Sequence, residues 1–97
     1  MMVRYSPRAI LDITTIASYL ISKSPAGAAA VESAIQQTIQ LLADFPGSGR
    51  TVEQRRTVRV IPLNRYPYLV FYTEIDDAIL ILHIRHGARR PVEPDDL

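Results

Sequence analysis

Five residues with side chains able to do chemistry lie close together near the end of this 97-residue chain: His83, Arg85, His86, Arg89 and Arg90. An imidazole titrates near neutral pH and can accept or donate a proton. A guanidinium binds phosphate or carboxylate through paired hydrogen bonds. The five residues lie within or just after the apolar run 78–84, so a buried strand would present them together at its C-terminal end. This end of the chain is the first candidate for a functional site.

Positive charge is concentrated in the same half of the chain. Residues 50–90 contain eight arginines and four acidic residues, a net charge of +4, whereas residues 1–49 are neutral and residues 91–97 carry −3. An arginine-rich surface suits an acidic protein partner or a nucleic acid. On charge alone, an ordinary solvated surface is an equal alternative.

Composition narrows the class of protein. With 47% hydrophobic and 22% charged residues, the chain is predicted to be one globular domain over residues 1–97, with 91–97 as a flexible acidic tail. It has no cysteine, which excludes disulfides, thiolate metal sites and a cysteine nucleophile. Two histidines do not make a zinc site, so we expect no metal and no cofactor. Neither a membrane span nor a signal peptide is apparent, and a cytoplasmic protein is expected.

The first half of the chain predicts a short strand at residues 3–5 and two helices. Ser6-Pro7 and Ser24-Pro25 each supply an N-cap followed by proline at the first helical position. The helices should span about 7–22 and 25–43 and pack as an antiparallel hairpin, because two or three residues separate them. We expect Asp12 and Tyr19 to be surface or edge residues. The predicted inner faces, from the three- and four-residue spacing, are Ile10, Ile13, Ile16 or Ala17, Leu20 and Ile21, and then Ala28, Val31, Ile35, Ile39 and Leu42.

The stretch 45–50 contains a proline and two glycines, which raises the possibility of a loop that cradles phosphate. No lysine followed by serine or threonine comes after it, as a phosphate-binding loop requires. A helix stop is therefore the better interpretation.

Three strands should follow. Residues 56–61 alternate between apolar and polar, and two apolar runs, 66–72 and 78–85, flank an acidic turn at 74–77. The predicted order is β-α-α-β-β-β. This is an α+β fold in which an antiparallel sheet packs on the N-terminal helical hairpin. The opposite face of the sheet, rimmed by arginine, is expected to stay partly open for a partner.

The order of several short motifs resembles the RelE/ParE superfamily of small bacterial toxins. The motifs are Tyr5-Ser6-Pro7-Arg8-Ala9, Phe45-Pro46-Gly47 with Gly49-Arg50, Tyr66-Pro67-Tyr68 leading to Phe71-Tyr72, and His86-Gly87-Ala88-Arg89. The resemblance spans residues 4–90. It implies the β-α-α-β-β-β fold, a role in growth inhibition or plasmid stabilisation, and a hetero-oligomer with a cognate antitoxin whose C-terminal segment wraps the toxin.

The superfamily has two branches. RelE-like members enter the ribosome and cleave messenger RNA without a metal, whereas ParE-like members poison DNA gyrase. The resemblance places His86 where some nucleases have a catalytic histidine and Arg89 near a catalytic arginine, with Arg59 and His83 as further candidates. The nuclease pattern has an arginine that binds the scissile phosphate, and Leu69 stands in its place. No tyrosine follows Arg90 either.

Metal-free RNA cleavage needs a general base, a general acid and cations for the phosphorane charge. Strand parity separates the two histidines, because His83 and Arg85 point one way and His86 the other. A structural role for His86 is the alternative. We therefore predict a ParE-like toxin that is not an enzyme. The other possibilities are a metal-independent endoribonuclease and a degenerate member that binds only its antitoxin. The predicted target-binding residues are Arg85, His86, Arg89 and Arg90, and the predicted antitoxin-binding residues are Arg56, Arg59 and Arg65.

Overall fold

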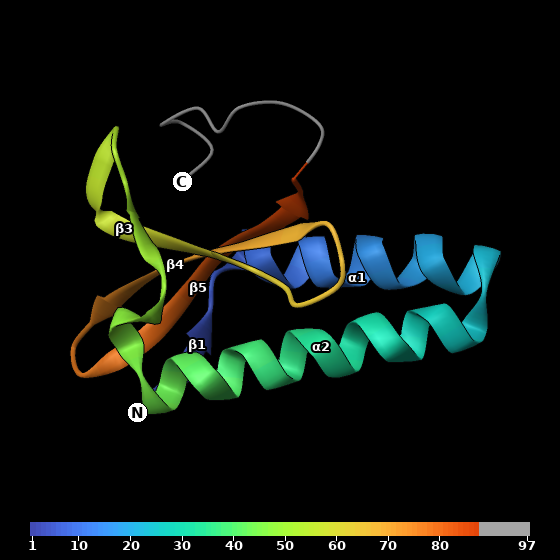
Figure 1. Ribbon diagram of the computed structural model, residues 1–97, viewed down its shortest axis with the longest axis horizontal. Helices are drawn as coiled ribbons and strands as arrows, with labels where there is room; N and C mark the ends of the chain where they lie inside the picture. Colours follow the sequence, from blue (N-terminus) through green and yellow to red (C-terminus); the bar gives the residue numbers. More distant parts are fainter. Residues whose placement is uncertain (88–97) are drawn as a thin grey trace.

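The structure, a computed structural model, describes residues 1–87. Two helices and a five-stranded sheet make up an α+β fold, as predicted from the sequence (Figure 1). The elements in chain order are β1 (Met2–Tyr5), α1 (Pro7–Lys23), α2 (Pro25–Asp44), a 3-10 turn η1 (Pro46–Ser48), β2 (Arg50–Val52), β3 (Arg55–Pro62), β4 (Tyr68–Ile75) and β5 (Ala78–His86). Neither helix is long and apolar enough to cross a membrane, within the residues described.

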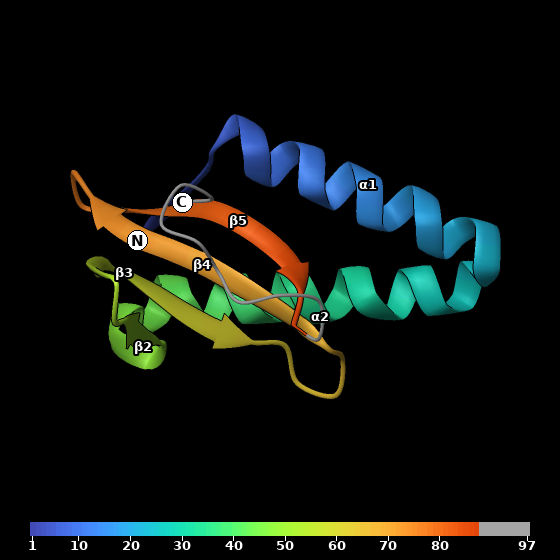
Figure 2. The same cartoon turned by 90° about the horizontal axis from the view of Figure 1, so that it is seen from above.

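The strands lie in the order β1-β5-β4-β3-β2 (Figure 2). The pairs β2–β3, β3–β4 and β4–β5 are antiparallel, which agrees with short connections between successive strands. β1 is parallel to β5, because the two helices carry the chain back before it enters the rest of the sheet. The sequence had not predicted β2, which is three residues long and pairs with β3 through an irregular register.

Both helices begin as predicted from their caps. The Ser6 hydroxyl accepts a hydrogen bond from the Ala9 amide, and the Ser24 hydroxyl accepts one from the Gly27 amide.

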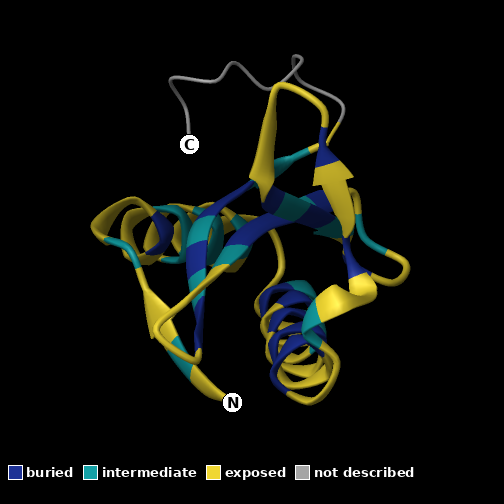
Figure 3. Ribbon diagram, turned by 90° about the vertical axis from the view of Figure 1, so that its left-hand side faces the viewer, coloured by how far each residue is buried: buried dark blue, intermediate teal, exposed yellow. Residues whose placement is uncertain are grey.

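α2 turns its buried side toward the sheet, and Figure 3 shows it end-on with the exposed side facing away. All five predicted inner residues of α2 are buried. In α1 the prediction was wrong for Ile10 and Ile21, which are 56% and 58% exposed, because α1 packs along the edge of the sheet and buries a narrower stripe.

The sheet has a hydrophobic core on each face. The larger core lies between the helices and the sheet and includes Leu42, Tyr72 and Ile81, none of which is exposed. The smaller one, on the opposite face, consists of Val52, Val58, Val60 and Phe71, each no more than 6% exposed. On the face that was expected to stay partly open, these four residues are buried while Leu69 and Leu82 beside them are only partly buried. The four buried residues pack on one another, and β2 supplies one of them.

The hairpin between β4 and β5 turns at Asp76 and Asp77, whose φ angles of 50° and 61° lie in the left-handed region. Two successive positive φ angles match the right-handed twist of the strands that the turn joins. Further along, His83 pairs with Phe71 but Ile81 pairs with Tyr72, so β5 has one extra residue, Leu82. This β-bulge reverses which side chains face the helices. It explains why the apolar run of β5 does not alternate regularly.

β1 covers the outer edge of β5 only as far as Ile81. Beyond it, residues at the start of α1 satisfy the exposed backbone groups. The Ser6 hydroxyl donates to the Leu82 carbonyl at 2.8 Å, and a carboxylate oxygen of Asp12 accepts from the Ile84 amide at 2.9 Å. The first turns of α1 therefore protect the strand edge that leads to the basic end of the chain.

Candidate functional site

His86 and Arg85 lie on opposite faces of the sheet at the C-terminal end of β5. His86 pairs with Tyr68 and meets its ring edge-on, with ring centroids 5.5 Å apart. Arg85 pairs with Leu69, on the other face, and its guanidinium lies 5.9 Å from the centroid of the Phe71 ring. The two side chains are both partly exposed. The predicted alternation of this strand end is therefore correct, and the two groups cannot act on one bond together.

His83 is fixed by Asp12 of α1. The Nδ1 atom lies 2.6 Å from a carboxylate oxygen, and the same oxygen accepts the Ile84 amide. The His83 ring stacks on Phe71 at 5.8 Å and is 2% exposed. Its Nε2 atom is buried and has no hydrogen-bond partner among residues 1–87. An aspartate that orients a histidine is an arrangement known from catalysis, but a buried ring gives no access to a substrate.

Arg59 lies near the other end of the sheet and faces the helices. Its guanidinium donates to the Gly49 carbonyl at 2.7 Å. It pairs with Tyr72, four residues along β4 from the partner of His86, so Arg59 and His86 are separated by roughly 13 Å along the strand direction and lie on either side of β4. The position of Arg59 thus ties the loop after α2 to the sheet.

Tyr72 completes this tie. Its hydroxyl donates to the Pro46 carbonyl and accepts from the Gly49 amide, both at 2.8 Å. Burial raises the pKa of the Tyr72 phenol above its ordinary value of 10.0, while the Gly49 amide and the charge of Arg59 act in the opposite direction. A Cβ on Gly49 would lie 2.7 Å from the Tyr72 oxygen, so this position needs glycine. The loop binds a tyrosine rather than phosphate, in agreement with the helix stop predicted from the sequence.

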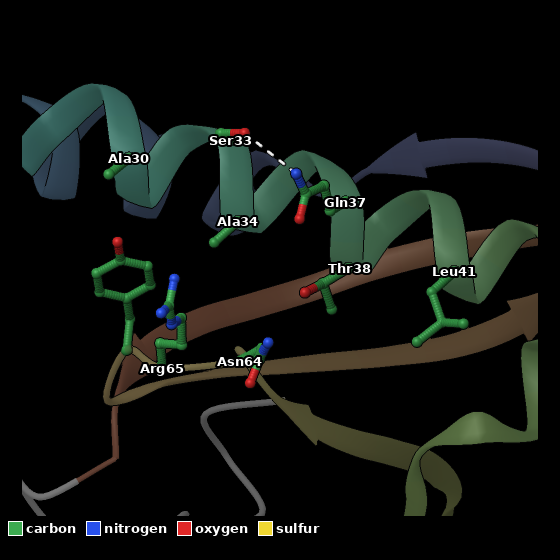
Figure 4. A pocket seen from close by; sticks show the side chains of 9 residues that line it. Ala30, Ser33, Ala34, Gln37, Thr38, Leu41, Asn64 and Arg65 are labelled. Atoms are coloured by element: carbon green, nitrogen blue, oxygen red, sulfur yellow. Dashed lines mark hydrogen bonds between the residues drawn. The ribbon is translucent and has the colours of Figure 1, made fainter.

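The predicted antitoxin-binding residues do not form one patch. Arg56, at the start of β3, and Arg65, beyond its end, are both exposed and stand roughly 20 Å or more apart at the extended spacing of a strand. Arg65 lines a pocket of about 430 Å³ between α2 and the loop before β4 (Figure 4). Arg89 and Arg90 lie outside the described residues. The functional roles of all these residues remain predictions.

A family model decides the classification. The model for the ParE toxin of the type II toxin-antitoxin system parDE matches residues 3–91. The chain belongs to the ParE toxin family. It is also similar to two curated Caulobacter vibrioides proteins. Toxin RelE2 is 32% identical over 83 residues, 84% of this chain and 90% of that protein. Toxin RelE3 is 27% identical over 88 residues, 91% of this chain and 96% of that protein.

A solved structure agrees with this family assignment. A chain from the chromosomal ParDE system of P. aeruginosa superimposes with a TM-score of 0.75 and 25% identity, over 89% of this chain and 95% of that one. The α+β fold expected from the resemblance is thus confirmed, with β2 as an addition to the predicted β-α-α-β-β-β order. Membership in the ParE toxin family makes this protein a type II toxin of the RelE/ParE superfamily, with an antitoxin as its partner.

Sequence reasoning missed two features of this ParE-family chain. Asp12 was expected to be a surface or edge residue, yet its side chain is 12% exposed and accepts bonds from β5. No local pattern reveals this role, because the partners are 71 and 72 residues away. Arg65 was noted for its charge, but not for its φ of 77°, which is unusual for a residue other than glycine. The only indication of this conformation in the sequence was that Arg65 lies in a predicted turn between two strands.

Proposed function

We propose that this toxin is ParE-like and stops growth by binding DNA gyrase in the cytoplasm, without acting as an enzyme. One observation carries the proposal. The two histidines that could serve as a general base lie on opposite faces of the sheet, and the better oriented one, His83, is buried. An RNA nuclease needs its base and its phosphate-binding cations around one reacting bond.

Two further features support binding over cleavage. Leu69 occupies the place where the nuclease pattern has arginine, and its side chain packs against the smaller core. Arg59, a candidate for stabilising charge in a nuclease, already donates to the Gly49 carbonyl. Gyrase as the target rests on the family, whose model describes ParE toxins of parDE systems.

The target-binding surface in this proposal is the C-terminal basic segment of Arg85, His86, Arg89 and Arg90. Gly87 follows His86 and its amide donates to the Pro67 carbonyl at 2.7 Å, so the end of β5 that carries Arg85 and His86 is held in place. Arginine side chains at such a point suit a phosphate or an acidic protein surface. Gyrase with its bound DNA offers both.

A RelE-like endonuclease that cleaves messenger RNA on the ribosome is the second candidate. The names of the two similar Caulobacter vibrioides toxins, RelE2 and RelE3, favour it. In that case His86 is the general base, and Arg89 stabilises the charge that develops on the phosphate. No metal takes part in this alternative.

The cognate antitoxin is proposed to hold this chain in a hetero-oligomer. A second groove, of about 480 Å³ between α1 and α2, is lined largely by apolar side chains such as Ile13, Leu20 and Ile35. An amphipathic antitoxin segment could bury its apolar side there. Arg56 and Arg65 are the predicted charged contacts on the sheet side, and Arg59 is the weakest of the three because its guanidinium already binds Gly49.

Purified toxin distinguishes the two targets. We expect it to inhibit DNA supercoiling by gyrase and trap cleaved DNA, and to leave messenger RNA intact on translating ribosomes. Addition of antitoxin should reverse the inhibition. Cleaved messenger RNA with unaffected gyrase would instead support the nuclease.

A further inference from the structure

The pocket between α2 and the loop before β4 has an unusual lining. Six of its residues come from the side of α2 that faces the loop, and the other three are Asn64, Arg65 and Tyr66. Small residues, Ala30 and Ala34, line one wall of the pocket, and Figure 4 shows the Arg65 side chain pointing from the loop toward α2, with Asn64 on the same loop. The pocket is thus a gap between the helical layer and the end of the sheet.

Arg65 has a backbone conformation that does not favour arginine. Its φ of 77° lies in the left-handed region, where glycine or asparagine is accommodated with less strain. Hydrogen bonds on either side hold the turn, from the Leu63 amide to the Tyr68 carbonyl and from the Tyr68 amide to the Tyr66 carbonyl, both at 2.9 Å. Strain kept at one position is typical of a functional contact.

The guanidinium of Arg65 is available to a ligand. The side chain is exposed, and no hydrogen bond or ion pair joins it to another residue in the range 1–87. No polar contact within that range therefore holds the guanidinium in place. Its five N–H donors match the two oxygens of a carboxylate.

The other residues that line the pocket indicate which chemical class of ligand it suits. Arg65 is the only charged residue of the pocket, and the remaining polar groups are hydroxyls and amides that can donate hydrogen bonds. Binding of a nucleic acid backbone depends on several cations that neutralise successive phosphates. This pocket instead has one cation, neutral hydrogen-bond donors and an apolar wall that includes Leu41. Such a lining suits a single acidic side chain that has an apolar neighbour.

We propose that this pocket receives an aspartate or glutamate side chain of the antitoxin, held by the Arg65 guanidinium. The inference rests on the proposed function, since it specifies where the antitoxin is anchored. The left-handed backbone of Arg65 then has a purpose, because it directs the exposed guanidinium toward α2 (Figure 4). Antitoxin binding is thereby assigned to a residue outside the proposed target-binding set, although the same turn accepts the Gly87 amide through the Pro67 carbonyl.

The test measures the affinity of the cognate antitoxin for three variants of the full chain at about 0.15 M salt. Arg65→Gln and Arg65→Gly remove the guanidinium, and the second also relieves the backbone strain. Arg50→Gln removes the same charge from β2, outside the pocket. We expect both Arg65 variants to bind about tenfold more weakly or worse, and Arg50→Gln to bind like the wild type.

A double-mutant cycle identifies the partner carboxylate. Each acidic residue of the antitoxin is changed to its amide and measured against wild-type toxin and Arg65→Gln. One such change should weaken binding to the wild type but have little further effect on Arg65→Gln. The thermal midpoint of Arg65→Gly should be at least that of the wild type, so that its lost affinity cannot be attributed to unfolding.

The inference is wrong if the Arg65 variants bind within twofold of the wild type, or if Arg50→Gln weakens binding equally. It is also wrong if no antitoxin carboxylate is coupled to Arg65. These results leave the proposed toxin function intact, because the wild-type complex still forms. If the wild-type chain does not bind the antitoxin at all, the proposed function fails together with the inference.

Discussion

At the scale of single residues, Tyr72 connects the sheet to the loop after α2. Its buried hydroxyl makes two hydrogen bonds, to Pro46 and Gly49. Tyr72→Phe leaves both backbone groups without this partner and should lower the free energy of unfolding by about 1–3 kcal/mol. Urea denaturation measures the change. Tyr19→Phe, at a position 57% exposed, is the matched control and should change the free energy by less than about 0.5 kcal/mol.

The raised pKa of Tyr72 predicts a dependence of stability on alkaline pH. Folding favours the neutral phenol, so its contribution is complete below the unfolded pKa near 10.0 and is lost as the pH rises through the higher folded pKa. Stability of the wild type should therefore fall more steeply above about pH 10 than stability of Tyr72→Phe. Denaturation curves for both proteins across this range test the prediction. Parallel curves would contradict it.

Asp12 is the second residue whose role depends on a distant partner. Asp12→Ala removes the acceptor for the Ile84 amide and the contact to His83, and should lower the free energy of unfolding by about 1.5–3 kcal/mol. Asp44→Ala is the control, because Asp44 is exposed and accepts one long bond from Gln40. Thermal melts of both variants decide the point. If the two variants had the same thermal midpoint, Asp12 would not stabilise the edge of β5.

At the scale of elements, substitutions on the buried and exposed sides of the helices should have very different effects on the free energy of unfolding. Ile39 of α2 is 7% exposed and belongs to the larger core, whereas Ile10 of α1 is 56% exposed. Ile39→Ala should cost about 2–5 kcal/mol of stability through lost burial and a cavity. Ile10→Ala should be nearly neutral in the free toxin. Chemical denaturation of the pair compares them, and a similar loss in both would mean that α1 is packed differently.

Local signals explain which elements could be predicted. The two Ser-Pro caps and the helical spacing fix α1 and α2 closely, and alternation indicates β3. The acidic turn was predicted at 74–77, but the observed turn consists of Asp76 and Asp77 alone, because Glu74 and Ile75 still pair with β5. β2 was missed because three residues give no periodic pattern.

The bulge at Leu82 marks the limit of sequence reasoning about the candidate site. Simple alternation would put His83 on the same face as Ile79 and Ile81, toward the helices. The extra residue turns it to the opposite face, against Phe71. The predicted separation of the two histidines is correct, since both follow the bulge. The contact of His83 with Asp12 depends on the packing of α1 along the β5 edge, which no local pattern encodes.

At the scale of the whole molecule, His86 at the end of β5 and the pocket lined by Arg65 lie near the same end of the sheet. Gly87 bonds to Pro67, and Pro67 follows the loop that lines the pocket. An antitoxin anchored at Arg65 would therefore lie close to the segment that we propose contacts the target. We propose on this basis that the antitoxin neutralises the toxin by covering the proposed target-binding surface.

The most direct test of the central claim, toxicity by binding rather than by catalysis, is the growth of cells that produce His86→Gln. Glutamine can make hydrogen bonds but does not titrate near neutral pH, so it cannot replace a general base. We predict that His86→Gln folds, binds antitoxin and still arrests growth, because glutamine keeps the hydrogen-bonding capacity that a target contact needs. Arg89→Ala combined with Arg90→Ala should lose toxicity and still bind antitoxin. A His86→Gln protein that folds and binds antitoxin but leaves cells unharmed would contradict the account and favour the nuclease.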